Sequence, residues 1–116
     1  MEISIKSGVF IGLKEVVQKQ KKHLEARITK FKEKEPVRSQ FFGKEKILEL
    51  LNKEGCIGIK LIYGADEKGM PSTIIAAADS GLKVISKDST GLKDPDDNSY
   101  LANGPNCPQI CAPSNG

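Results

Sequence analysis

Tryptophan is absent from the sequence, and aromatic residues fill only 5% of its 116 positions. The hydrophobic core must therefore come from Ile, Leu, Val and Ala. No apolar run approaches the roughly 18 residues that suggest a membrane-spanning helix. The first residues do not form a secretory signal either, because Glu2, Lys6 and Ser7 interrupt their apolar side chains. We expect a cytoplasmic protein without a membrane partner.

Residues for catalysis are also scarce. The chain has one histidine, His23, and no phosphate-binding loop or complete set of metal ligands. A nucleophile assisted by His23 would need Cys56 or a serine brought beside an exposed helix. The acidic segments 66–69 and 94–98 lack the alternating oxygen ligands and the closing Glu of a calcium loop. The sequence therefore predicts no enzyme activity and no cofactor.

Three cysteines are the candidates for special chemistry. Cys56 follows a glycine, and Cys107 and Cys111 lie four apart in a proline-containing tail. In a reducing compartment an odd count favours free thiols. Two alternatives are a reversible disulfide between Cys107 and Cys111 and a tetrahedral zinc site that adds Cys56 and His23. We predict no metal, because only one pair of ligands is closely spaced and His23 lies on a lysine-rich helix.

Two helices are indicated by apolar periodicity. The first, at about 11–33, carries Phe10, Val17, Leu24 and Phe31 seven residues apart. The second, at about 44–54, has a wide apolar face and ends at Gly55. That face consists of Ile47, Leu48, Leu50 and Leu51.

Alternating side chains and turn residues predict strands at about 56–63, 72–78, 82–86 and 99–102. The run Ala76-Ala77-Ala78 is a poor strand former, and we interpret it as a place where a helix crosses close to the sheet. The predicted fold is α+β, with two helices packed on a three- to four-strand antiparallel meander. It forms a single domain over 1–103, and 104–116 is an irregular tail with proline and cysteine.

Basic residues are concentrated near the N-terminus of the sequence. Residues 14–38 hold nine basic and four acidic side chains, a balance of 9 − 4 = +5, whereas the whole chain carries +3. The candidates for contact with an anionic partner are Lys14, Lys19, Lys21, Lys22, Arg27 and Lys30. Interleaved glutamates and the lack of stacking aromatics favour a solvated helix face over nucleic-acid binding. The seven-residue repeat allows homodimerisation through the same helix.

Several short motifs resemble those of a group of short uncharacterised bacterial proteins. In that group a Phe-Phe-Gly segment precedes a helix, a Gly-Cys-x-Gly-Ile-Lys/Arg strand follows, and the chain ends in Cys-Pro-x-x-Cys. The matching residues here are Phe41-Phe42-Gly43, Gly55-Cys56-Ile57-Gly58-Ile59-Lys60 and Cys107-Pro108-Gln109-Ile110-Cys111. The resemblance implies a bacterial origin and implies that Cys56, Cys107 and Cys111 belong to one arrangement. It does not indicate a function.

We therefore expect a non-catalytic, cytoplasmic protein-interaction module that binds another protein or a second copy of itself. A thiol-redox or zinc protein using Cys56, Cys107 and Cys111 is one alternative. A weak nucleic-acid binder acting through the first helix is the other.

Overall fold

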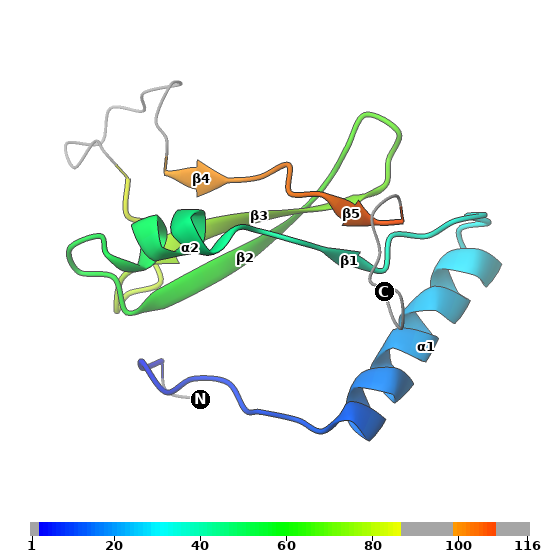
Figure 1. Cartoon of the computed structure of the whole chain (residues 1–116), viewed down its shortest axis with the longest axis horizontal. Helices are drawn as coiled ribbons and strands as arrows, with labels where there is room; N and C mark the ends of the chain where they lie inside the picture. The colour runs from blue at the N-terminus through cyan, green and yellow to red at the C-terminus, as the bar shows by residue number, and fades with distance from the viewer. Residues whose placement is uncertain (1–2, 87–98, 109–116) are drawn as a thin grey trace. The chain divides into compact units, whose positions relative to one another are not determined.

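The computed structural model describes residues 3–86 and 99–108. These residues form two compact units (Figure 1). The first unit comprises the described parts of Met1–Ser7 and Phe42–Gly104, and the second those of Gly8–Phe41 and Pro105–Gly116.

A three-stranded antiparallel sheet forms the centre of the first unit. Its strand order is β2 (Gly58–Ala65), β3 (Pro71–Ala78) and β4 (Tyr100–Leu101). Asp66 closes the hairpin between β2 and β3, because its Oδ1 accepts hydrogen bonds from the N–H groups of Lys68 and Met70, both at 2.9 Å. Gly69 follows with φ = 80°, a left-handed conformation that glycine adopts without strain. The predicted antiparallel meander is confirmed.

One helix, α2 (Lys44–Leu51), packs on this sheet. Its Leu50 joins Ile75 and Ala77 of β3 in a buried cluster. Half-buried side chains close around that cluster: Phe42, Ile47, Cys56, Ile85 and Leu101. The predicted close approach of a helix to the alanine run is confirmed at Ala77. Neighbouring strand residues point to opposite faces, so Ala76 and Ala78 are buried on the other side of the sheet.

The predicted strand 82–86 forms only an isolated bridge, between Val84 and Ala78. The start of this segment forms a tight turn, because the Asp79 carboxylate accepts hydrogen bonds from the N–H groups of Gly81 and Lys83. Ile85 still donates its N–H to the Ala77 carbonyl, at 3.0 Å. The segment therefore lies against β3 without becoming a regular strand.

The second unit contains α1 (Leu13–Thr29) and a two-stranded antiparallel sheet of β1 (Ser39–Gln40) and β5 (Asn106–Cys107). The chain returns along α1 after the helix ends. His23 Nε2 lies 2.9 Å from the Val37 carbonyl, and Gln20 Nε2 donates to the Arg38 carbonyl at 2.9 Å. Within the predicted irregular tail 104–116, residues 106–107 thus form a strand.

The α+β class is confirmed, and the differences lie in how the elements are grouped. Only α2 shares a compact unit with the meander, whereas α1 belongs to the other unit together with residues 105–108. Both helices are shorter than the predicted ranges 11–33 and 44–54, since each ends a turn or more before the next proline or glycine. Among the described residues, no helix has the length and apolar character needed to span a bilayer.

Candidate interaction surfaces

Among residues 3–86 and 99–108, no strand pairs with the outer edge of β2, and apolar side chains follow this edge. In the three-stranded sheet β2 is a terminal strand, eight residues long. Direct partners across an antiparallel pair share a face, so Ile59, Leu61 and Tyr63 lie on the face that carries Ile75 and Ala77. Leu61 is 49% exposed and Tyr63 86% exposed. The helix-covered face of the sheet therefore continues beyond α2 as an apolar strip along β2, which is open at Leu61 and Tyr63 and at Ile59 also borders a cavity lined by residues 3–7.

This edge carries few of the features that protect exposed strands. Natural edge strands are usually short, interrupted by proline or a bulge, or charged. β2 has no proline, and its one charged residue is Lys60, whose Nζ donates to the Leu82 carbonyl at 3.0 Å. Lys60 points to the face opposite Leu61. The strip of Ile59, Leu61 and Tyr63 is therefore uncharged.

Sequence reasoning predicted the strand but missed the exposure of this strip. Alternation of apolar residues in 56–63 normally indicates side chains that are buried, because the apolar face of a strand is usually covered by other elements. The signal that could have revealed the exposure is the small amount of helix available to cover the sheet. One eight-residue helix, α2, is too short to cover a hairpin of two eight-residue strands, because a helix rises about 1.5 Å per residue and a strand about 3.3 Å.

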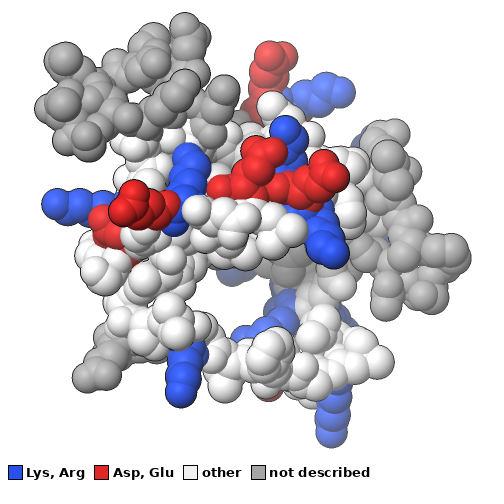
Figure 2. Space-filling view, turned by 60° about the vertical axis from the view of Figure 1, so that its left-hand side comes forward, with Lys and Arg blue, Asp and Glu red and all other residues white. Residues whose placement is uncertain are grey.

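The predicted basic residues all lie on or directly after α1, and they differ in their surroundings. Lys14, Lys21, Lys22 and Lys30 are exposed. Lys19 lies 3.9 Å from Glu15, in an exposed pair of little energetic weight. On the face of the molecule in Figure 2, acidic and basic side chains lie beside each other with uncharged areas between them.

Arg27 has a structural role instead. Its guanidinium forms a two-pronged ion pair with Glu33, with Nη2 donating to Oε1 at 2.8 Å, and it lies 4.5 Å from the centre of the Phe31 ring. The hydrogen bonds from Arg27 hold the pKa of Glu33 below its usual value. Because these contacts occupy its guanidinium, Arg27 is the least available of the predicted contact residues.

The cysteines fall into two states. Cys107 is disulfide-bonded and 2% exposed, so the expected thiol is wrong at this position. Strand pairing holds it in place, since the Arg38 N–H donates to the Cys107 carbonyl at 2.7 Å. Cys56 is a free thiol in the first unit and donates to the Gly58 carbonyl at 3.2 Å. Cys111 lies outside the described residues, so the predicted pairing with Cys107 stays a prediction.

The candidate zinc ligands are not assembled in the part of the chain that the structure describes. Within residues 3–86 and 99–108, no group of three His, Cys, Asp or Glu side chains is arranged to hold a metal ion. A disulfide-bonded Cys107 has no thiolate to offer a metal. His23 is occupied by the Val37 carbonyl.

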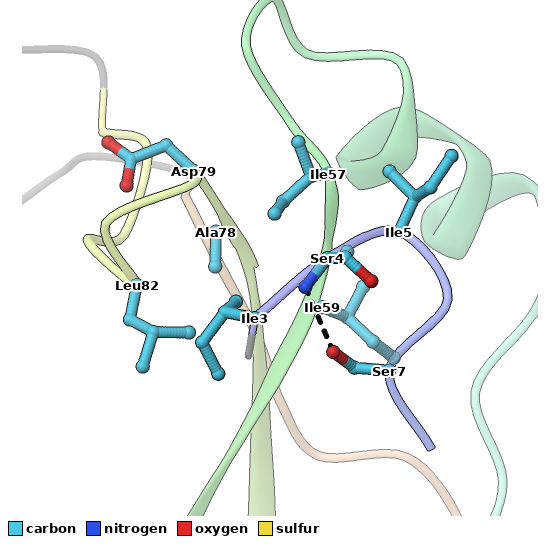
Figure 3. A pocket seen from close by; sticks show the side chains of 10 residues that line it. Ile3, Ser4, Ile5, Ser7, Ile57, Ile59, Ala78, Asp79 and Leu82 are labelled. Carbon is cyan, nitrogen blue, oxygen red and sulfur yellow. Dashed lines mark hydrogen bonds between the residues drawn. The ribbon is translucent and has the colours of Figure 1, made fainter. Parts of the chain in front are cut away.

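A cavity of about 270 Å³ lies at one end of the sheet in the first unit (Figure 3). Its lining is mainly aliphatic, and Ile3 and Ile5 face Ile57, Ile59 and Leu82 across it. The polar groups at its rim are satisfied locally. Ser7 Oγ accepts the Ser4 N–H, and the Asp79 carboxylate is held in its turn. The cavity therefore offers mainly apolar volume, bordered by two serines and a carboxylate that already accept hydrogen bonds from nearby N–H groups.

No protein-family model, no curated protein and no solved structure matches the chain. The support for the candidate surfaces therefore comes from the exposure, charge and strand pairing described above.

Proposed function

We propose that the chain is a non-catalytic protein-interaction module that forms a homodimer by pairing β2 with β2 of a second copy. The single observation that carries this proposal is the exposed, uncharged strip of Ile59, Leu61 and Tyr63 on an eight-residue terminal strand. A terminal strand presents unpaired N–H and C=O groups, and a long apolar one associates unless it is covered. Pairing with a second copy would give the backbone groups of this edge hydrogen-bond partners and would also cover the apolar strip.

The strip is complementary to itself. In an antiparallel pair with Leu61 on the twofold axis, Leu61 meets Leu61 of the second copy, and Ile59 meets Tyr63. An isologous interface of this kind closes after two copies and does not propagate. All three pairs lie on one face, so two three-stranded sheets would join into a six-stranded sheet with one continuous apolar side.

Charge favours this edge over the first helix as the dimer contact. α1 contains five basic and two acidic residues, a balance of 5 − 2 = +3, so two copies placed side by side repel each other. β2 carries a single positive charge, on Lys60. In the register centred on Leu61, Lys60 lies opposite Ile62 of the second copy and meets no like charge.

The experiment is light scattering after size exclusion, with the wild-type chain and two charge variants. The wild type should elute as a dimer. Leu61→Lys and Leu61→Glu should each elute as a monomer, because two like charges would meet on the twofold axis. Mixing the two variants should restore a dimer, since opposite charges then face each other.

A matched tyrosine pair controls for the general effect of a new surface lysine. Tyr63→Lys changes the proposed contact, whereas Tyr100→Lys changes a half-exposed tyrosine of β4 at the other side of the sheet. Only Tyr63→Lys should weaken the dimer. A wild-type chain that stays monomeric at high concentration would contradict the proposal, and so would a mixture of the Leu61 variants that stays monomeric.

We further propose that the chain resides where disulfides persist, in place of the cytoplasmic location expected from the sequence. The support is the disulfide at buried Cys107, because such bonds are rare where thiol reductants dominate. Fractionation of the source cells, with the chain followed by antibody, tests this location. Recovery with cytosolic proteins would contradict it.

A further inference from the structure

The two sides of α1 differ in what they contact. Hydrogen bonds from Gln20 and His23 to the carbonyls of Arg38 and Val37 fix one side of the helix to the returning chain. No residue of α1 is buried in the described structure. Leu24, in the second half of the apolar stripe, is half-buried, whereas the first half of the stripe is exposed to water, which leaves the start of the helix marginally stable without a further contact.

That stripe is most exposed at the start of the helix and just before it. Val9 is 90% exposed, Phe10 is fully exposed, and Leu13 is 72% exposed. Val17 continues the stripe one turn later and is also exposed. Within α1, Leu13 and Val17 are four apart, so their side chains project from one side, and Phe10 precedes them on the extended segment that leads into the helix. The protein thus presents an apolar ridge made of a short extended segment and the first turns of α1.

Lysines border the ridge. Lys14 directly follows Leu13, and Lys21 follows Val17 by four positions, so both lie beside the ridge on the helix surface. Lys22 adds a third exposed ammonium. Glu15 is seven positions before Lys22, so both lie on the side of the helix away from Leu13, where Glu15 is 3.9 Å from Lys19. An apolar ridge flanked by long cationic side chains is the composition of helices that lie in the plane of a lipid surface.

We propose that residues 9–22 bind an anionic lipid surface, with Phe10, Leu13 and Val17 inserted among the acyl chains and Lys14, Lys21 and Lys22 at the headgroups. Charge complementarity selects an anionic surface. The apolar ridge selects lipid over nucleic acid, because a phosphate backbone would leave Phe10 and Leu13 in water. This contact uses a different surface from the β2 edge and involves no membrane-spanning segment.

The first test is sedimentation of the full chain with vesicles of phosphatidylcholine containing phosphatidylserine, against vesicles of phosphatidylcholine alone. Binding should require phosphatidylserine and weaken as salt is raised. Phe10→Ser should weaken binding about tenfold. Phe41→Ser, which removes an exposed phenylalanine of the same unit, should leave it unchanged.

The absence of tryptophan permits a direct test of insertion. Phe10→Trp places a single reporter in the ridge, and its fluorescence should shift to shorter wavelength when the anionic vesicles are added. Phe41→Trp should show no shift. Circular dichroism on each variant establishes that the helices are intact.

Three results would overturn the proposal: no binding to either vesicle, binding that Phe10→Ser leaves unchanged, or no fluorescence shift in Phe10→Trp. Tighter binding of the wild type to a mixed RNA than to the anionic vesicles would assign the lysines to nucleic acid instead. Failure here would leave the β2 dimer untouched, since light scattering in the absence of lipid tests that separately.

Discussion

Leu50 should be the most sensitive position of the first unit. It is 4% exposed, and its side chain fills the space between α2 and the β3 residues Ile75 and Ala77. Leu50→Ala would remove the largest buried side chain that α2 contributes. The surrounding side chains come from α2 itself, from β3 and β4, and from the segments at Phe42, Cys56 and Ile85.

The expected cost follows from burial. Leucine-to-alanine changes in a core cost about 2–5 kcal/mol, because the lost transfer free energy adds to the cost of a cavity. Leu51, the next residue of the same helix, is 42% exposed. Leu51→Ala removes the same atoms and changes helix propensity equally, but much of its side chain already lies in water. We expect it to cost roughly 1 kcal/mol.

Urea unfolding followed by circular dichroism measures both free energies of unfolding. A domain of this size has about 5–15 kcal/mol of stability, so Leu50→Ala should lower the transition midpoint strongly. Leu51→Ala should lower it by about half of that amount or less. Equal destabilisation by the two variants would refute the assignment of Leu50 to the core and of Leu51 to the surface.

Three further predictions concern the turn, the ion pair and the cysteines. Asp66→Ala should destabilise the first unit by about 1 kcal/mol in urea unfolding, because it leaves two turn N–H groups without their acceptor, while the Glu67→Ala control should have little effect. Since hydrogen bonds from Arg27 lower the pKa of Glu33, the ion pair stabilises the fold above the unfolded pKa of about 4.3, and this stabilisation is lost as pH falls through the lower folded pKa. Glu33→Gln should therefore reduce the loss of thermal stability on acidification, and an unchanged pH profile would refute this. Without reductant, the mass of the wild type and of Cys56→Ser should each be lower by the two hydrogens lost in a disulfide, whereas Cys111→Ser should show the reduced mass. A full-mass wild type would contradict the disulfide at Cys107.

The helices and the hairpin were predictable because their causes are local. The apolar face Ile47, Leu50 and Leu51 fixes the helical period of α2. Asp66 and Gly69 fix the turn between two alternating runs. The prediction of a strand at 82–86 was wrong because the Asp79 carboxylate accepts hydrogen bonds from the N–H groups of Gly81 and Lys83 and so holds the start of this segment in a turn.

The candidate surfaces were harder to predict, because exposure depends on what covers a residue. Alternation placed Ile59, Leu61 and Tyr63 on one side of a strand, and the seven-residue repeat predicted Phe10 and Val17 on one side of a helix, although the helix begins only at Leu13. Neither pattern reveals whether a neighbour lies against that side. The state of Cys107 escaped prediction for a similar reason, since the sequence argument rested on an assumed compartment and not on the chain itself.

By itself, the sequence determined the α+β class, the positions of the main helices and strands, and the excess of positive charge at the front of the chain. These follow from side-chain period, turn residues and composition, which act over a few neighbouring positions. Only the tertiary structure decided that α1 belongs to a different unit from the meander, that Arg27 is paired with Glu33, and that the edge of β2 and the ridge of α1 are exposed. Those properties depend on contacts between residues far apart in the chain, and the number of elements available for packing sets which apolar faces stay open.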